Sequence, residues 1–203
     1  FLPPWPDPNG GLSINTANQS RFTRTTFEVN SAYPTEGAPF TTHALLWRIF
    51  GPNFAGCQFK NTRADSEVSG SADLGQGIYS LDARFKVVAD CPCGQWLEPA
   101  HTCICAERSR FEGLDHAIEA GDALTTRNFT VVNTDFVNNI CGVYANGVVN
   151  PVVKNNHFTM GGRGVLLTHP SEIEWQDLHR AVYTTETYGT RIDDNVIVMD
   201  ANA

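Results

Sequence analysis

Several features that would place the chain in common functional classes are missing or scarce. Charged residues make up only 18% of its 203 residues, the formal net charge is -8, and the lysines and arginines form no cluster. Nucleic acid is therefore not an expected partner, because neutralising phosphates requires clustered cations. No apolar stretch reaches the roughly 18 residues that a transmembrane helix needs, so no transmembrane segment is predicted. Strongly periodic helical segments are also missing, which argues against a helical fold.

The chain does contain an internal repeat with a period of 22 residues. The segment Asn128–Asn138 reads NFTVVNTDFVN, and Asn150–Met160 reads NPVVKNNHFTM. The aligned pairs include Val131 with Val153, Asn133 with Asn155, and Phe136 with Phe158. A fixed period of this length, with asparagines and short β-rich runs, is typical of stacked coils.

Further copies of the pattern extend the repeat along the chain. Residues 22–29 read FTRTTFEV, residues 54–61 read FAGCQFKN, and residues 192–197 read IDDNVI. In three copies a small residue and then an aliphatic one follow the phenylalanine, and the aliphatic residue lies seven positions after it. These aliphatic residues are Ile118, Val143 and Val165. The marker residues, one for each of about six coils, are Phe27, Phe59, Phe111, Phe136, Phe158 and Ile197.

We therefore predict an all-β fold, a right-handed single-stranded parallel β-helix of about six coils. Coils stacked about 4.8 Å apart hydrogen-bond through their backbones and bring like residues together, so the marker residues should form one internal stack. Asn133 and Asn155 should form a ladder at a turn, because asparagine tolerates left-handed backbone. A β-sandwich with asparagine-rich turns is the alternative, but it does not require the constant offset of seven. The predicted loop excursions are Pro34–Thr42, Thr62–Gly75, Cys91–Cys105 and Thr168–Thr187.

The two ends suggest how the domain is bounded. Residues 1–20 are rich in proline and glycine and are predicted to be an extended lead-in, and residues 21–203 to form the β-helix. The last residues, NVIVMDANA, stop just after a predicted strand. An open strand edge invites pairing, so we expect a segment of a longer chain. The expected partners are further coils of the same polypeptide or neighbouring subunits.

Four of the six cysteines lie close together, as Cys91-Pro-Cys93 and Cys103-Ile-Cys105. A hairpin with nested disulfides, Cys91 to Cys105 and Cys93 to Cys103, is one interpretation, although sequence does not fix connectivity. A four-thiolate zinc site, with His101 as a possible replacement ligand, and free thiols are the alternatives. We predict oxidised pairs, which imply an oxidising compartment and export. Cys57 lies two positions before Phe59, so it should point to the same side of the strand and be buried.

Three segments resemble a known family. They read GQGIYSLDARFKVVADCPC, SRFEGLDHAIEAG and NFTVVNTDFVNNICGVYANG. They are similar to the right-handed parallel β-helix segments of large secreted and cell-surface proteins of Bacteroidota, which carry an F-x-G-[LF]-x-x-[AG]-I coil after a Cys/Pro-bearing insertion. The resemblance covers roughly Arg21–Asp200 and implies that fold, with export by the type IX secretion system. The wider fold family also contains pectate-lyase-like enzymes that cut acidic polysaccharides, and phage tailspikes.

Resemblance to the lyases of that wider family implies a site with carboxylates that bind calcium and an arginine or lysine base, all on one face of successive coils. The candidates here are Asp193, Asp194, Arg191 and Lys154. Alignment of the coils places Asp193 near Lys154, which we interpret as an exterior ion pair. Other acids are isolated: Asp135 aligns with His157, and Asp82 and Arg84 suggest an exposed strand. The six histidines lack metal-binding spacing, so we predict no catalytic residues, no metal ligands and no cofactor.

Two function classes remain. The first is a non-catalytic structural or adhesive β-helix segment of a large secreted or surface-attached bacterial protein, with a fibrous assembly as a further hypothesis. The second is a polysaccharide-active, lyase-like enzyme or a carbohydrate-binding β-helix. Surface polysaccharide is a candidate partner in either class. Four aromatic residues could stack on sugar rings: Trp5, Trp96, Trp175 and Tyr188. Acids and a base converging on one coil face beside a groove would distinguish the second class from the first.

Overall fold

Three six-stranded parallel sheets make up most of the fold. The computed structural model describes residues 12–15, 19–33, 40–68, 70–97, 102–122, 127–161 and 179–199. Helical structure in these ranges is confined to the 3-10 turn η1 (Asp65–Glu67) and the single turn α1 (Ser71–Leu74). None of the helices in this part of the chain is long and apolar enough to cross a membrane. The all-β class predicted from the sequence is therefore confirmed.

Apart from β9 and β10, which pair with each other, each sheet contains every third strand along the chain. The first sheet contains β1 (Leu12–Asn15), β4 (Thr42–Trp47), β7 (Gln76–Leu81), β12 (His116–Gly121), β15 (Cys141–Asn146) and β18 (Arg180–Thr185), in that order. The second contains β2 (Arg21–Thr23), β5 (Phe50–Ala55), β8 (Arg84–Val88), β13 (Phe129–Val132), β16 (Val152–Lys154) and β19 (Arg191–Asp193). The third contains β3 (Thr26–Val29), β6 (Gln58–Asn61), β11 (Ser109–Glu112), β14 (Thr134–Val137), β17 (His157–Met160) and β20 (Val196–Met199).

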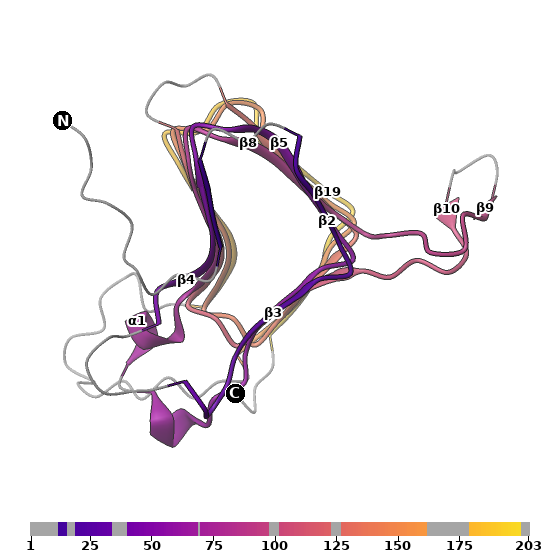
Figure 1. The fold of residues 1–203 in the computed structure, drawn as a ribbon. Coiled ribbons are helices and arrows are strands. Elements are labelled where there is room, and N and C mark those ends of the chain that lie inside the picture. The colour runs from indigo at the N-terminus through magenta and orange to yellow at the C-terminus, as the bar shows by residue number, and fades with distance from the viewer. Residues whose placement is uncertain are drawn as a thin grey trace.

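The chain passes through the first, second and third sheets in turn, and we call each such passage a circuit. The sheets form three sides of a roughly triangular outline in Figure 1, with successive circuits lying over one another. All pairing within the three sheets is parallel, and Val131 pairs with Val153 as predicted. This arrangement is compatible with a parallel β-helix. The lead-in expected over residues 1–20 already contains β1, which pairs in parallel with β4.

The predicted excursions are confirmed in part. Thr62–Gly75 connects β6 to β7, and Cys91–Cys105 lies between β8 and β11. Most of Pro34–Thr42 lies outside the described residues. The excursion Thr168–Thr187 is wrong at its end, because Arg180–Thr185 forms β18.

The repeat pattern also failed at one strand. Val143 pairs with Val182, and not with a residue near Val165. Residues 162–178 lie outside the described part of the chain, and they separate β17 from the next strand of the first sheet. The offset of seven from Phe158 to Val165 was therefore misleading at this position, because an insertion breaks the repeat there.

A column of phenylalanine rings runs through the interior along the third sheet. The marker residues are in register from one circuit to the next, as predicted. Ring centroids are 4.8 Å apart for Phe27 and Phe59, and 4.6 Å for Phe59 and Phe111. The next spacings are 5.3 Å to Phe136 and 4.4 Å from there to Phe158. Parallel in-register strands thus convert a repeated residue into a continuous stack. Its last member, Ile197, is 53% exposed.

The corners between the second and third sheets use left-handed backbone. Asn133 and Asn155 have φ of 54° and 53°, as the asparagine pattern predicts. The side-chain amides that connect the circuits, however, belong to the residues that come directly after left-handed Asn155 and Asp194. Asn156 is fully buried and donates from Nδ2 to the Val131 carbonyl at 3.1 Å. Asn195 repeats this contact to Val153 at 2.9 Å. The ladder is therefore displaced by one residue from the predicted pair, because the left-handed residue turns the next side chain inward.

Candidate functional site

The outward side of the first sheet carries a cluster of polar and aromatic side chains, which we call the first-sheet face. Within β12, Ile118 and Ala120 are buried, whereas His116 and Glu119 are only partly buried. Strand alternation therefore turns Glu119, between two buried residues, away from the core. His116 lies on the same side because Ala117 and Ile118 are both buried and interrupt the alternation, and its ring centroid is 5.9 Å from that of Tyr144. In-register pairing places equivalent residues of neighbouring strands beside them. The face consists of Gln76, Tyr79, Asp115, His116, Glu119, Tyr144, Arg180 and Tyr183.

The side chains of the first-sheet face contact one another across four strands. His116 Nδ1 lies 2.9 Å from Asp115 Oδ2, and Gln76 donates a hydrogen bond to Glu119. The rings of Tyr144 and Tyr183 stack with centroids 5.3 Å apart. The Arg180 guanidinium lies 4.5 Å from the centre of the Tyr183 ring. One carboxylate pair, one imidazole and several hydroxyl groups thus converge on a single sheet surface.

Burial and neighbouring charges shift the titration of three groups on this face. Burial raises the pKa of Glu119, and the charge of Asp115 adds to this effect. Burial would lower the pKa of His116, but the hydrogen bond and charge of Asp115 together with Glu119 outweigh it, so the pKa is raised. Burial and Glu119 also raise the pKa of Tyr79. Clustered groups with shifted pKa values are common at binding and catalytic sites.

The first-sheet face was not predicted from the sequence. Glu119 and Tyr144 each lie eight positions after a marker phenylalanine, so the repeat contained a usable signal for these two residues. The signal for Tyr183 is hidden, because residues 162–178 separate β18 from the marker Phe158. The histidines show no metal-binding spacing in the sequence. His116 meets its partners through strand pairing, which sequence spacing does not reveal.

The candidates from the wider fold family form exterior ion pairs. Lys154 is in register with Asp193 as predicted, but the predicted ion pair between these two residues is wrong, because each has another partner. Lys154 Nζ lies 3.6 Å from Asp194 Oδ2, and Asp193 is bonded by Arg191. Each carboxylate has a cationic partner, which neutralises the charge that would attract calcium.

The other isolated acids also have defined partners. Asp135 is in register with His157 and lies 2.6 Å from Arg108 Nε. The prediction that Asp82 is an exposed strand residue is wrong. Asp82 is buried at a corner with φ of 51°, and its carboxylate lies 3.7 Å from Arg48. Arg84, at the start of β8, is exposed as expected. Among the four aromatic residues proposed for sugar stacking, Tyr188 has a described side chain, and it is 67% exposed.

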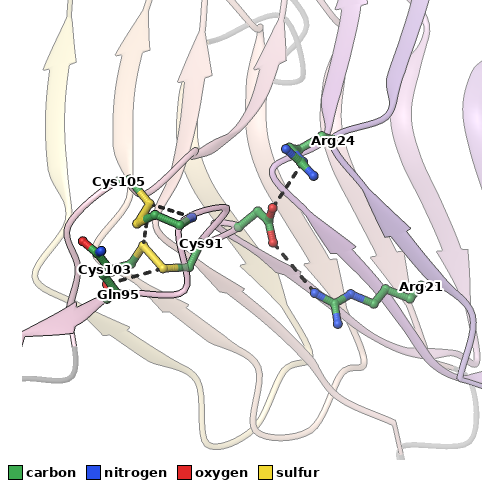
Figure 2. The surroundings of a disulfide bond; sticks show 8 residues. Arg21, Arg24, Cys91, Gln95, Cys103 and Cys105 are labelled. Carbon is green, nitrogen blue, oxygen red and sulfur yellow. Dashed lines mark hydrogen bonds and ion pairs between the residues drawn. A yellow bond between two sulfur atoms is a disulfide. The ribbon is translucent and has the colours of Figure 1, made fainter.

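The cysteine-rich segment forms an antiparallel hairpin, β9 (Trp96–Leu97) with β10 (Thr102–Cys103), which we call the cysteine hairpin. It projects from the corner between the second and third sheets (Figure 1). Figure 2 shows the cysteines gathered at its base. They are joined in pairs, Cys91 with Cys103 and Cys93 with Cys105.

The oxidised pairs agree with prediction, but the nested connectivity considered from the sequence does not. The register of the hairpin explains the difference. Cys103 lies opposite Trp96, so a simple ladder does not bring Cys93 across from Cys103. A turn in which the Gly94 amide donates to the Cys91 carbonyl at 3.0 Å interrupts the first strand.

The neck of the hairpin is fixed to the body of the protein. Asp90 and Glu107 form an antiparallel bridge, and the Ser109 hydroxyl donates to the Val88 carbonyl at 2.7 Å. The Asp90 carboxylate also lies 3.4 Å from Arg24 and 3.8 Å from Arg21 of the first circuit (Figure 2). These contacts close the insertion at the point where it leaves the sheets.

The remaining cysteines, Cys57 and Cys141, are buried free thiols, which confirms the prediction for Cys57. Burial raises both pKa values, that of Cys141 to about 12. The thiolate of Cys141 is therefore on the order of 10³-fold scarcer than that of a normal cysteine at neutral pH.

We expect the native oxidised protein to show no fast-reacting thiol. Aromatic disulfide reagents react with the thiolate, and burial keeps Cys57 and Cys141 protonated and shielded. Spectrophotometric thiol counting should give two thiols per chain after denaturation without reductant. Six thiols in the same assay would show that the four hairpin cysteines are reduced. Rapid reaction in the native state would contradict the burial of the two free cysteines.

No protein-family model matches the chain, and no curated protein or solved structure matches it either. The features of the molecule that bear on its function are the first-sheet face, the phenylalanine column and the cysteine hairpin.

Proposed function

We propose that the chain is a right-handed parallel β-helix that acts as a non-catalytic structural or adhesive segment of a large secreted or surface-attached bacterial protein. The observation that carries this proposal is the unbroken register of the phenylalanine column. Circuits that stack in register through three sheets make a stiff element, because bending would separate hydrogen-bonded strands on one side. The cyclic order of the sheets supports the β-helix, and the crossover rule supports its hand.

Export is the second part of the proposal. Paired cysteines in an exposed hairpin are stable in an oxidising compartment. Assignment to Bacteroidota and to type IX secretion rests on the resemblance of the coil motif alone. Surface polysaccharide is the partner that best suits an adhesive role, since hydroxyl, amide and charged groups on the first-sheet face can hydrogen-bond to sugars.

A polysaccharide-active enzyme is the second candidate, and the first-sheet face is the observation that favours it. Glu119 has a raised pKa and lies close to the Asp115–His116 pair. A carboxyl group with a raised pKa is better suited to act as a general acid, and a neighbouring carboxylate or imidazole can act as a base. The same groups can also bind a polymer without cleaving it.

The two candidates are separated by incubating the full chain with pectin, alginate and chondroitin-type polymers, with and without calcium. The structural proposal expects neither unsaturated ends nor new reducing ends. If the first-sheet face mediates adhesion, the chain should bind a polymer without cleaving it, and Tyr183→Ala should abolish the binding. Lys86→Ala is the matched control, because Lys86 is exposed on the second sheet.

Cleavage that disappears in Glu119→Gln would replace the structural proposal with the enzymatic one and locate the reaction on the first-sheet face. Cleavage that disappears instead in Asp193→Ala or Lys154→Ala would locate it on the second sheet. Cleavage by all variants alike that co-elutes with the chain on gel filtration would also contradict the structural proposal, because the activity would then lie elsewhere on the chain. Cleavage that separates from the chain would come from a contaminating enzyme.

A further inference from the structure

The geometry points to a second state of the cysteine hairpin: when both disulfides are reduced, the four thiolates bind one zinc ion. The ligand atoms are Sγ of Cys91, Cys93, Cys103 and Cys105, which all lie within 4.8 Å of one another. This closeness is not a consequence of the disulfides alone. Cys103 and Cys105 are not bonded to each other, yet their sulfur atoms are 3.6 Å apart.

These separations match those of a tetrahedral zinc–thiolate site. A Zn–S bond of about 2.3 Å places the sulfurs of a tetrahedral site about 3.8 Å apart. The longest sulfur–sulfur separation in the cluster, at most 4.8 Å, therefore needs to shorten by only about 1 Å. The two bonded pairs open to the same distance after reduction. Four soft thiolates select zinc over calcium or magnesium, which prefer oxygen ligands.

Local backbone features favour thiolate at this position. The amide of Cys93 donates a hydrogen bond to Cys105 Sγ over 3.0 Å. A hydrogen bond of this kind stabilises a negatively charged sulfur and orients it as a ligand. Cys93 is exposed, and the other three cysteines are partly buried. Reductant and metal can therefore reach the cluster, in contrast to the buried Cys57 and Cys141.

The position of the hairpin allows the exchange without disturbance of the core. The Asp90–Glu107 bridge and the Ser109 hydrogen bond to Val88 close the neck beneath the cysteines. A rearrangement of the sulfur atoms therefore remains outside the three sheets. The same four residues can hold the hairpin together in either redox state, by covalent bonds when oxidised and by metal coordination when reduced.

The redox step is balanced by a dithiol. Each protein disulfide accepts two electrons and two protons from one dithiol, which becomes a disulfide, so two dithiol molecules reduce the cluster. Zinc then binds the sulfurs as thiolates, and the thiol protons are released to solvent. Reoxidation by a disulfide reverses the exchange and releases the metal. This inference concerns the hairpin alone and does not depend on the proposed function.

The test is metal binding by the full chain in both redox states. The protein is reduced with a dithiol, which is removed by gel filtration under anaerobic conditions, and is then titrated with cobalt(II) and with zinc. We expect one metal ion per chain, with the visible absorption of a tetrahedral cobalt(II)–thiolate complex. This absorption should be lost when zinc displaces cobalt. The oxidised chain should take up none.

Two variants locate the site. Cys93→Ser with Cys105→Ser removes one complete disulfide and should abolish tight binding, whereas Cys141→Ala should retain it. Circular dichroism of each variant establishes that the sheets are intact. Absence of tetrahedral cobalt absorption in the reduced wild-type chain would overturn the inference. Undiminished binding by the Cys93→Ser, Cys105→Ser variant would overturn it as well.

Discussion

Phe136→Ala is expected to lower the free energy of unfolding by about 4 kcal/mol, the usual range for removing a buried phenylalanine. Phe136 is fully buried and stacks on Phe111 and Phe158 in the middle of the column. Its loss leaves a cavity that the neighbouring circuits cannot close, because their spacing is set by backbone hydrogen bonds. For a chain of this length the midpoint of thermal unfolding should fall by on the order of 10 °C, measured by circular dichroism.

Ile197→Ala is the matched control for this prediction. Ile197 belongs to the same column, but it is 53% exposed and contacts a neighbouring circuit on one side through β17. Its truncation should cost less than about 1 kcal/mol, since most of its surface already contacts water. Equal destabilisation by the two substitutions would show that position in the column does not determine stability.

Gly142→Ala is expected to destabilise the protein by about 3 kcal/mol, the upper end of the usual range for overpacking. A Cβ at Gly142 would lie 2.5 Å from the Ala181 carbonyl oxygen and 2.7 Å from the Phe158 ring. The carbonyl belongs to β18, so the clash can be relieved only by moving a paired strand. Denaturant unfolding should show the loss as a lower midpoint.

Gly121→Ala provides the comparison, because Gly121 lies in the same sheet at the end of β12. A Cβ there would meet its nearest neighbour, Leu81 Cδ1, at 3.5 Å, an ordinary contact. The change should be within about 0.5 kcal/mol of neutral or slightly stabilising, since glycine in a strand is entropically unfavourable. A neutral Gly142→Ala would mean that β15 and β18 are not packed as described.

The sequence predicted those parts of the fold that repeat. The marker residues identified the third-sheet column, since in-register stacking imposes the same residue type in each circuit. The small residue before each aliphatic one has a physical reason: Gly142 makes room for the ring of Phe158, and Gly77 for that of Phe111. Where an insertion interrupts the period, as before β18, the same pattern misplaced the strand.

The candidate sites were less accessible to prediction for a different reason. The first-sheet face joins Gln76, Glu119 and Tyr183 from three circuits, and their proximity depends on register across insertions of unequal length. The cysteine cluster was visible in the sequence, but its pairing depends on the hairpin register and on the turn at Gly94. The residue types at these sites were therefore easier to predict from the sequence than their arrangement in space.

The closed neck of the cysteine hairpin has a consequence for how such a chain can change length during evolution. At the other described corners between the second and third sheets one or two residues suffice, such as Asn133 between β13 and β14. At the equivalent corner the chain leaves after Val88 and returns at Ser109, where the two segments are bridged. Material can thus be gained, lost or exchanged at this corner while every strand keeps its partners. The corner is accordingly a natural place to graft a foreign peptide.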